Sequence, residues 1–132
     1  MSKEIGKCLC GHVEVECYDL PKNVAACYCE DCQKASGGGA SYNILISDEK
    51  IKIVKGKPST YKMKAASGNS LERVFCPKCG SAICSRLSSR TVWKAGLFNH
   101  LKDLEVAINV WASSSNKLSQ VDRSKQTFEQ GR

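Results

Sequence analysis

Hydrophobic and polar residues alternate along much of this chain, which is the pattern of strands that bury one face. Residues 13–18 illustrate it, with valines and a cysteine on one face and two glutamates on the other. The pattern predicts strands at residues 13–18, 24–27, 42–46, 51–54, 60–63, 71–75, 82–87, 91–97 and 104–111. We therefore expect a mainly β fold of antiparallel sheets.

Residues 29–36 interrupt this alternation, and we expect them to form a helical turn. Residues three apart in a helix share a face, so the turn would place Cys29 beside Cys32. The glycines at 37–39 end it, either as a plain loop or as a close approach of the backbone to another group. Residues 65–70 are expected to form a polar loop of small residues.

The chain has 132 residues, which is the length of one domain. We expect this domain to span residues 1–111, because the composition from residue 112 onward turns to Ser, Asn, Lys, Gln and Asp. The tail, residues 112–132, is expected to be loosely ordered or packed on the surface. The sequence has no apolar run long enough for a membrane span and no secretory signal core, so we expect a cytoplasmic protein.

The formal charge of +7 is consistent with a nucleic-acid partner. However, the basic residues are scattered, and many alternate along predicted strands as on a solvated sheet face. Seven thiolates and two Zn²⁺ ions, argued below, would lower the charge to about +4. Nucleic-acid binding is therefore an alternative interpretation and not the leading one.

The nine cysteines change the picture most. A reducing compartment and an odd count both disfavour a disulfide framework. Seven cysteines form close groups of the kind that bind zinc, namely Cys8 with Cys10, Cys27 with Cys29 and Cys32, and Cys76 with Cys79. The other two, Cys17 and Cys84, lie in strand-like segments and are expected in the core.

The segment 76–80, Cys-Pro-Lys-Cys-Gly, has the form of a zinc knuckle. Pro77 fixes φ in the turn, and Gly80 lets backbone amides face the sulfurs. A closed structural site needs four ligands, and each cysteine pair supplies two. We therefore predict a structural zinc that joins the first ten residues to the middle of the chain, held by Cys8, Cys10, Cys76 and Cys79.

The remaining group, Cys27, Cys29 and Cys32, offers three ligands. Three protein ligands with an open fourth position are the usual form of a catalytic zinc site. The alternative is a closed structural site with a fourth protein ligand. The sequence offers three candidates for that ligand: Cys84, His12 and His100.

Three motifs together are similar to the glutathione-dependent formaldehyde-activating enzyme family, which also includes centromere protein V. They are Gly6-x-Cys8-x-Cys10-Gly11-x-Val13, Cys27-x-Cys29-x-x-Cys32-x-Lys34-Ala35-Ser36-Gly37 and Phe75-Cys76-x-x-Cys79-Gly80-Ser81. The resemblance covers about residues 5–111 and fills all seven cysteine positions. It implies a zinc-stapled, β-tent-like fold with short helical turns and the same division of the cysteines into two zinc sites.

The resemblance also implies an activity. Members of the family are associated with joining glutathione and formaldehyde into S-hydroxymethylglutathione, and they are commonly classed as carbon–sulfur lyases. We therefore expect a zinc-dependent enzyme with glutathione as cosubstrate and with Cys27, Cys29 and Cys32 at its catalytic zinc. Glutathione is expected to contact the segment after these cysteines, at Lys34, Ser36, Gly37 and Gly38, with Arg73 as a further source of positive charge.

The chain departs from the family in its last third. The family often shows a Pro-x-x-His-aromatic stretch followed by a tryptophan, whereas residues 104–111 contain neither proline nor histidine. Leu118 stands near the place of the later tryptophan. The aldehyde substrate and the oligomeric state therefore stay open. The alternative function is a non-enzymatic, zinc-stabilised binding module for nucleic acid or a protein partner.

Overall fold

The computed structural model describes residues 2–65 and 67–131. Three residues lie outside this description: residue 1 of the expected domain, residue 66 of the expected loop and residue 132 of the expected tail. The described elements are β1 (Lys3–Lys7), β2 (Glu14–Tyr18), β3 (Asn23–Cys27), α1 (Glu30–Ser36), β4 (Ser41–Ile44), η1 (Asp48–Lys50), β5 (Ile51–Lys55), β6 (Ser59–Lys64), β7 (Ser70–Phe75), β8 (Ala82–Leu87), β9 (Thr91–Lys94), η2 (Ala95–Phe98), β10 (Glu105–Val110), η3 (Ala112–Ser114) and β11 (Gln126–Thr127). None of the helices in these two ranges has the length and apolarity that crossing a membrane requires.

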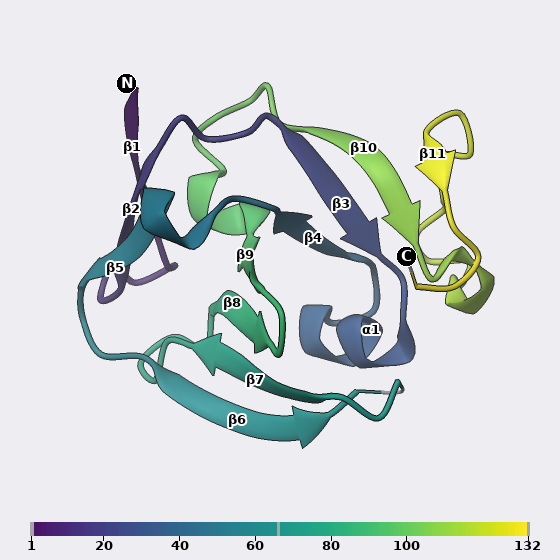
Figure 1. Cartoon of the computed structure of the whole chain (residues 1–132), viewed down its shortest axis with the longest axis horizontal. Helices are drawn as coiled ribbons and strands as arrows, with labels where there is room; N and C mark the ends of the chain where they lie inside the picture. The colour runs from purple at the N-terminus through teal and green to yellow at the C-terminus, as the bar shows by residue number, and fades with distance from the viewer. Residues whose placement is uncertain (1, 66, 132) are drawn as a thin grey trace.

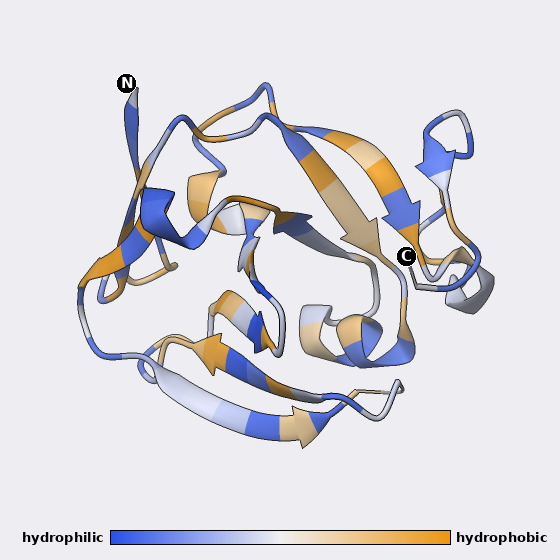
Figure 2. Ribbon diagram, viewed as in Figure 1, coloured by the Kyte–Doolittle hydropathy of each residue, from blue (hydrophilic) through white to orange (hydrophobic). Residues whose placement is uncertain are grey.

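Two sheets make up the fold, and the mainly β prediction is confirmed (Figure 1). The smaller sheet has the strand order β1-β2-β5, and the larger one has the order β11-β10-β3-β4-β9-β8-β7-β6. Most neighbours are antiparallel, but β10 pairs in parallel with both β3 and β11. The larger sheet is therefore mixed and not purely antiparallel. Figure 2 shows long apolar stretches on β3 and β10, whereas β6 and β11 are mostly polar.

Three details of the strand prediction were wrong, and the first is the omission of the two-residue strand β11. The strand expected at residues 91–97 ends at Lys94, and the chain continues as the 3₁₀ helix η2. Strand β1 was not predicted, because its sequence KEIGK lacks clear alternation. It packs against η2, where a Cβ atom on Gly6 would lie 2.8 Å from the Phe98 ring, so this strand requires glycine.

Strand pairing sorts the side chains of the larger sheet onto two faces, since directly opposed residues share a face. On one face Val74, Cys84, Trp93 and Ile44 follow one another across β7, β8, β9 and β4. All four are buried in the main core, which the smaller sheet covers. The expected core positions of Cys17 and Cys84 are confirmed.

The opposite face of the same strands carries several polar side chains, together with Val92, the partner of Ser85 on β9. Arg73 pairs with Ser85 across β7 and β8, and Lys94 pairs with Asn43 across β9 and β4. Side chains two apart on a strand share a face, so Ser41 belongs to it as well. We call Arg73, Ser85, Lys94, Asn43 and Ser41 the polar row. It ends beside Cys27, the partner of Ser41 on β3, on the side where α1 contacts β4.

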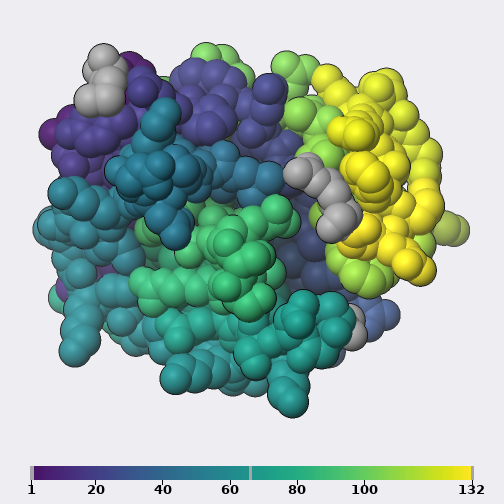
Figure 3. Space-filling view, in the orientation of Figure 1, coloured from purple at the N-terminus to yellow at the C-terminus, as the bar shows by residue number. Residues whose placement is uncertain are grey.

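The C-terminal segment returns along β10 and gathers at one side of the molecule (Figure 3). The Phe128 amide donates to the Asn109 carbonyl (2.8 Å), and the Trp111 amide donates to the Gln130 carbonyl (3.0 Å). The Asn116 amide group donates to the Gly38 carbonyl (3.0 Å) beyond α1. This segment therefore binds both β10 and the loop that follows α1.

Candidate metal centres

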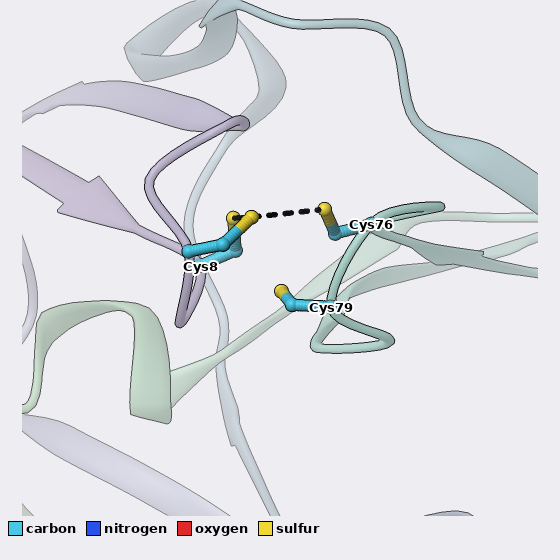
Figure 4. Close-up of side chains that lie close together, drawn as sticks. Cys8, Cys76 and Cys79 are labelled. Carbon is cyan, nitrogen blue, oxygen red and sulfur yellow. Dashed lines mark hydrogen bonds between the residues drawn. The ribbon is translucent and has the colours of Figure 1, made fainter.

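Two turns bring four cysteines together at one end of the larger sheet. Cys8 and Cys10 lie between β1 and β2, and Cys76 and Cys79 lie between β7 and β8. Figure 4 shows sulfurs from the two turns pointing into a common space. All four sulfurs lie within 4.8 Å of one another. The structure thus assembles the four residues that the sequence predicted for a structural zinc.

The sulfur spacing fits a tetrahedral ion. Cys10 Sγ lies 3.8 Å from Cys8 Sγ and 3.8 Å from Cys76 Sγ. Four sulfurs placed about 2.3 Å from a central Zn²⁺ are about 3.8 Å apart, because that is the edge of the corresponding tetrahedron. The cluster therefore has the dimensions of a four-thiolate zinc site.

Backbone amides face these sulfurs, as charged thiolates require. The Val13 amide donates to Cys8 Sγ (3.3 Å), and the Lys78 amide lies 3.4 Å from Cys76 Sγ. The glycine that follows each cysteine pair has a φ of +79°, in the left-handed region that favours glycine. The two cysteine turns therefore end in the same left-handed backbone conformation.

Ser81 favours the charged form of Cys79. Its Oγ lies 3.2 Å from Cys79 Sγ, and hydrogen bonds from the side chain and backbone of Ser81 lower the pKa of Cys79 to about 5. A thiol with such a pKa is a thiolate at neutral pH, which is the form that binds zinc.

The second group lies where β3 leads into α1. Cys27 ends the strand, Cys29 is the N-cap residue of the helix and Cys32 lies in its first turn. The Cys32 amide donates to Cys29 Sγ (3.3 Å), so the sulfur caps the helix. The three sulfurs lie within 4.8 Å of one another. The predicted helical turn is confirmed, and these three cysteines could hold a second ion.

No fourth ligand joins this group within residues 2–65 and 67–131. Cys84 lies on the opposite face of the sheet, in the core. His100 Nε2 lies 3.7 Å from Glu4 Oε2 instead. His12 directly follows the turn that carries the four-cysteine cluster. The three fourth-ligand candidates therefore stay outside the group.

The surroundings of Cys32 favour its thiolate. Hydrogen bonds from Cys27 and Cys29 lower the pKa of Cys32 to about 2, and the positive charges of Lys94 and Arg73 act in the same direction. Burial opposes them. The pKa values of Cys27 and Cys29 are raised, so the thiolate charge of this group gathers on Cys32, which Lys94 and Arg73 stabilise.

Sequence reasoning missed Lys94. Its ammonium group donates to Ser41 Oγ (2.7 Å) and to Asn43 Oδ1 (2.8 Å), and burial lowers its pKa. A signal for Lys94 was its position in the strand TVWK. It directly follows a core tryptophan, so its side chain must point to the opposite face of the sheet. Arg73, which the sequence suggested as a further source of positive charge, donates from Nε to the Met63 sulfur (3.3 Å).

A cavity of about 800 Å³ lies between the four-cysteine turn and the C-terminal end of α1. Its wall includes Cys8, Ser36, Ser41, Tyr42, Lys94 and His100. Cys27, Cys29 and Cys32 do not line it. It nevertheless reaches two members of the polar row, Ser41 and Lys94, beside the three-cysteine group.

The residues expected to contact glutathione face two different hollows. Ser36 lines the large cavity, whereas Lys34, Gly37 and Gly38 line a second one of about 430 Å³. A Cβ atom on Gly38 would lie 3.3 Å from Leu118. The neighbour that approaches the glycines closely is therefore the C-terminal segment.

Comparison with known proteins shows a family and a fold. A family model described as "Glutathione-dependent formaldehyde-activating enzyme" matches residues 3–114. A crystal structure of a Rhodobacter sphaeroides protein, a structural-genomics target, superposes with a TM-score of 0.59. The two chains are 17% identical over 95% of this chain and 99% of the other, so they share a fold. No curated protein matches the chain.

Proposed function

Because this chain belongs to the glutathione-dependent formaldehyde-activating enzyme family, we propose that it makes and breaks adducts of glutathione, or a similar thiol, with a small aldehyde. In the forward direction the thiol sulfur bonds to the aldehyde carbon, and the thiol proton is transferred to the carbonyl oxygen, which becomes a hydroxyl. With formaldehyde the product is S-hydroxymethylglutathione. The reverse reaction is that of a carbon–sulfur lyase, and its setting is the reducing cytoplasm.

The observation that carries this proposal is the contrast between the two cysteine groups. One has four sulfurs, and the other has three within the described parts of the chain. A closed set of four ligands is typical of structural zinc, and three ligands with an open position are typical of catalytic zinc. We therefore assign Cys8, Cys10, Cys76 and Cys79 to structure and Cys27, Cys29 and Cys32 to catalysis.

The chain's own residues have distinct tasks in this reaction. A bound zinc would supply the positive charge that keeps a thiol sulfur deprotonated near neutral pH. Cys27, Cys29 and Cys32 hold that charge in place, and α1 fixes two of them. The Lys94 ammonium group is held by β4 and has one N–H left to meet an oxygen of the substrate.

We assign glutathione to the large cavity, because the wall of this cavity joins Ser36 to Lys94. Lys7, Lys94 and His100 give this wall basic groups, which suit the two carboxylates of the tripeptide. Lys34, Gly37 and Gly38 would be reached only by a group that extends past α1.

The exchange of ¹³C-formaldehyde between its free and glutathione-bound forms tests this function. Exchange spectroscopy by NMR measures the rate at equilibrium, where the spontaneous reaction also runs. We expect the exchange rate to rise in proportion to the concentration of zinc-loaded protein. A rate equal to that without protein, for formaldehyde and for a panel of small aldehydes, would contradict the proposal.

A further inference from the structure

Two cations lie near the three-cysteine group without a carboxylate partner in the described ranges. Lys94 and Arg73 take part in none of the ion pairs there. The neighbouring acid on β7, Glu72, pairs with Arg86 instead (3.0 Å). Partly buried charges are normally paired, so these two are expected to meet an anion.

The register of the strands that carry these cations indicates where such an anion would bind. Arg73 and Lys94 belong to the polar row, which crosses the sheet and ends beside Cys27. The Lys94 ammonium group donates to Ser41 Oγ (2.7 Å), and Ser41 is the direct partner of Cys27 on β3. Lys94 is thus held beside the strand that carries Cys27, and Arg73 lies on the same face of the sheet, two strands farther along.

Charge counting shows which state of the site these cations balance. Three cysteine thiolates with one Zn²⁺ carry one net negative charge, so Lys94 and Arg73 leave an excess of one positive charge. A neutral fourth ligand does not change this excess. A fourth thiolate adds one negative charge and brings the sum over the ion, its thiolates and these two cations to zero.

From this balance we propose that Lys94 and Arg73 are specificity-determining residues, which make an anionic thiolate the fourth ligand that the three-cysteine site holds best. The inference rests on the proposed function and adds to it the two residues that select the charge of the fourth ligand. It also explains why Lys94 is fixed by Ser41 and Asn43: an immobile ammonium group stabilises an incoming anion without reorganising.

The test compares an anionic with a neutral fourth ligand on the zinc-loaded protein. The probes are 2-mercaptoethanol, which loses one proton on binding and has no carboxylate, and imidazole. Isothermal titration calorimetry at fixed pH measures both affinities. In Lys94→Met we expect the thiol affinity to fall by at least about tenfold, because a charge–charge interaction in a partly buried site is lost. The imidazole affinity should stay within about twofold.

Three further variants make the result specific. Lys94→Arg keeps the charge and should recover most of the thiol affinity, which a purely structural role would not predict. Arg73→Met should behave as Lys94→Met does, and it replaces that variant if the latter does not fold. Lys62→Met removes an exposed lysine of β6 and should change neither affinity.

The outcomes separate this inference from the proposed function. If Lys94→Met and Arg73→Met lower the affinities for both probes equally, or change neither, the charge-selection inference is wrong and the proposed function stands. If the zinc-loaded wild-type protein binds no thiol, both are wrong. A selective loss of thiol binding supports the inference.

Discussion

Replacing Cys76 with alanine is expected to abolish the cooperative folding of this domain. Its sulfur is fully buried and joins the β7–β8 turn to a cysteine 66 residues earlier in the chain. Structural zinc contributes about 10–16 kcal/mol of apparent binding free energy in small zinc domains, and this free energy is available only to the folded chain. Domains of this size have a net stability of about 5–15 kcal/mol, so losing even part of the metal contribution is expected to unfold the protein.

Cys84→Ala is the matched control for this variant. It makes the same chemical change at a thiol that is 1% exposed, on the core face of the same sheet, and it removes no candidate ligand. We expect it to lower the free energy of unfolding by only about 1 kcal/mol. Circular dichroism during heating measures both variants. An unfolding transition of Cys76→Ala close to that of Cys84→Ala would show that the four-cysteine cluster does not hold the fold together.

Replacing Cys29 with serine is expected to remove one zinc ion and the activity while leaving the fold intact. Serine is a good N-cap residue, so its hydroxyl can take the place of the sulfur that accepts from the Cys32 amide. The loss of a direct ligand should lower the exchange rate by more than the roughly 10- to 100-fold that follows loss of a ligand's hydrogen-bond partner. Metal analysis should find one zinc per chain in place of two.

The contrast between the two cysteine variants separates the roles of the two sites. Cys29→Ser should melt within a few degrees of the wild type, unlike Cys76→Ala. If Cys29→Ser retained two zinc ions, the division of the seven cysteines into two sites would be wrong. If it lost its fold, the three-cysteine group would be structural as well.

The cysteine groups could be predicted from the sequence because their ligands are close together in the chain. Spacing alone predicted Cys27, Cys29 and Cys32, since one helical turn brings the last two together. The long-range pairing of Cys8 and Cys10 with Cys76 and Cys79 followed from ligand counting, since each pair is incomplete alone. Alternation predicted most strands of the sheets for a similar reason, because it is a local signal.

The polar row could not be predicted, because it depends on strand register. Arg73 and Lys94 are 21 positions apart in the sequence, and only the pairing of β7, β8, β9 and β4 puts them on one face. The parallel pairing of β10 with β3 is also invisible to local alternation. Strand β11 was missed because a two-residue strand in a polar segment carries no periodic signal.

Native mass spectrometry of the purified chain, with and without glutathione, tests both metal sites and the open ligand position in one measurement. We expect two zinc ions per chain and one glutathione adduct that disappears in Cys29→Ser. Two zinc ions without an adduct would contradict the proposed binding of glutathione at an open site. A single zinc ion that survives in Cys29→Ser would contradict the second metal site itself.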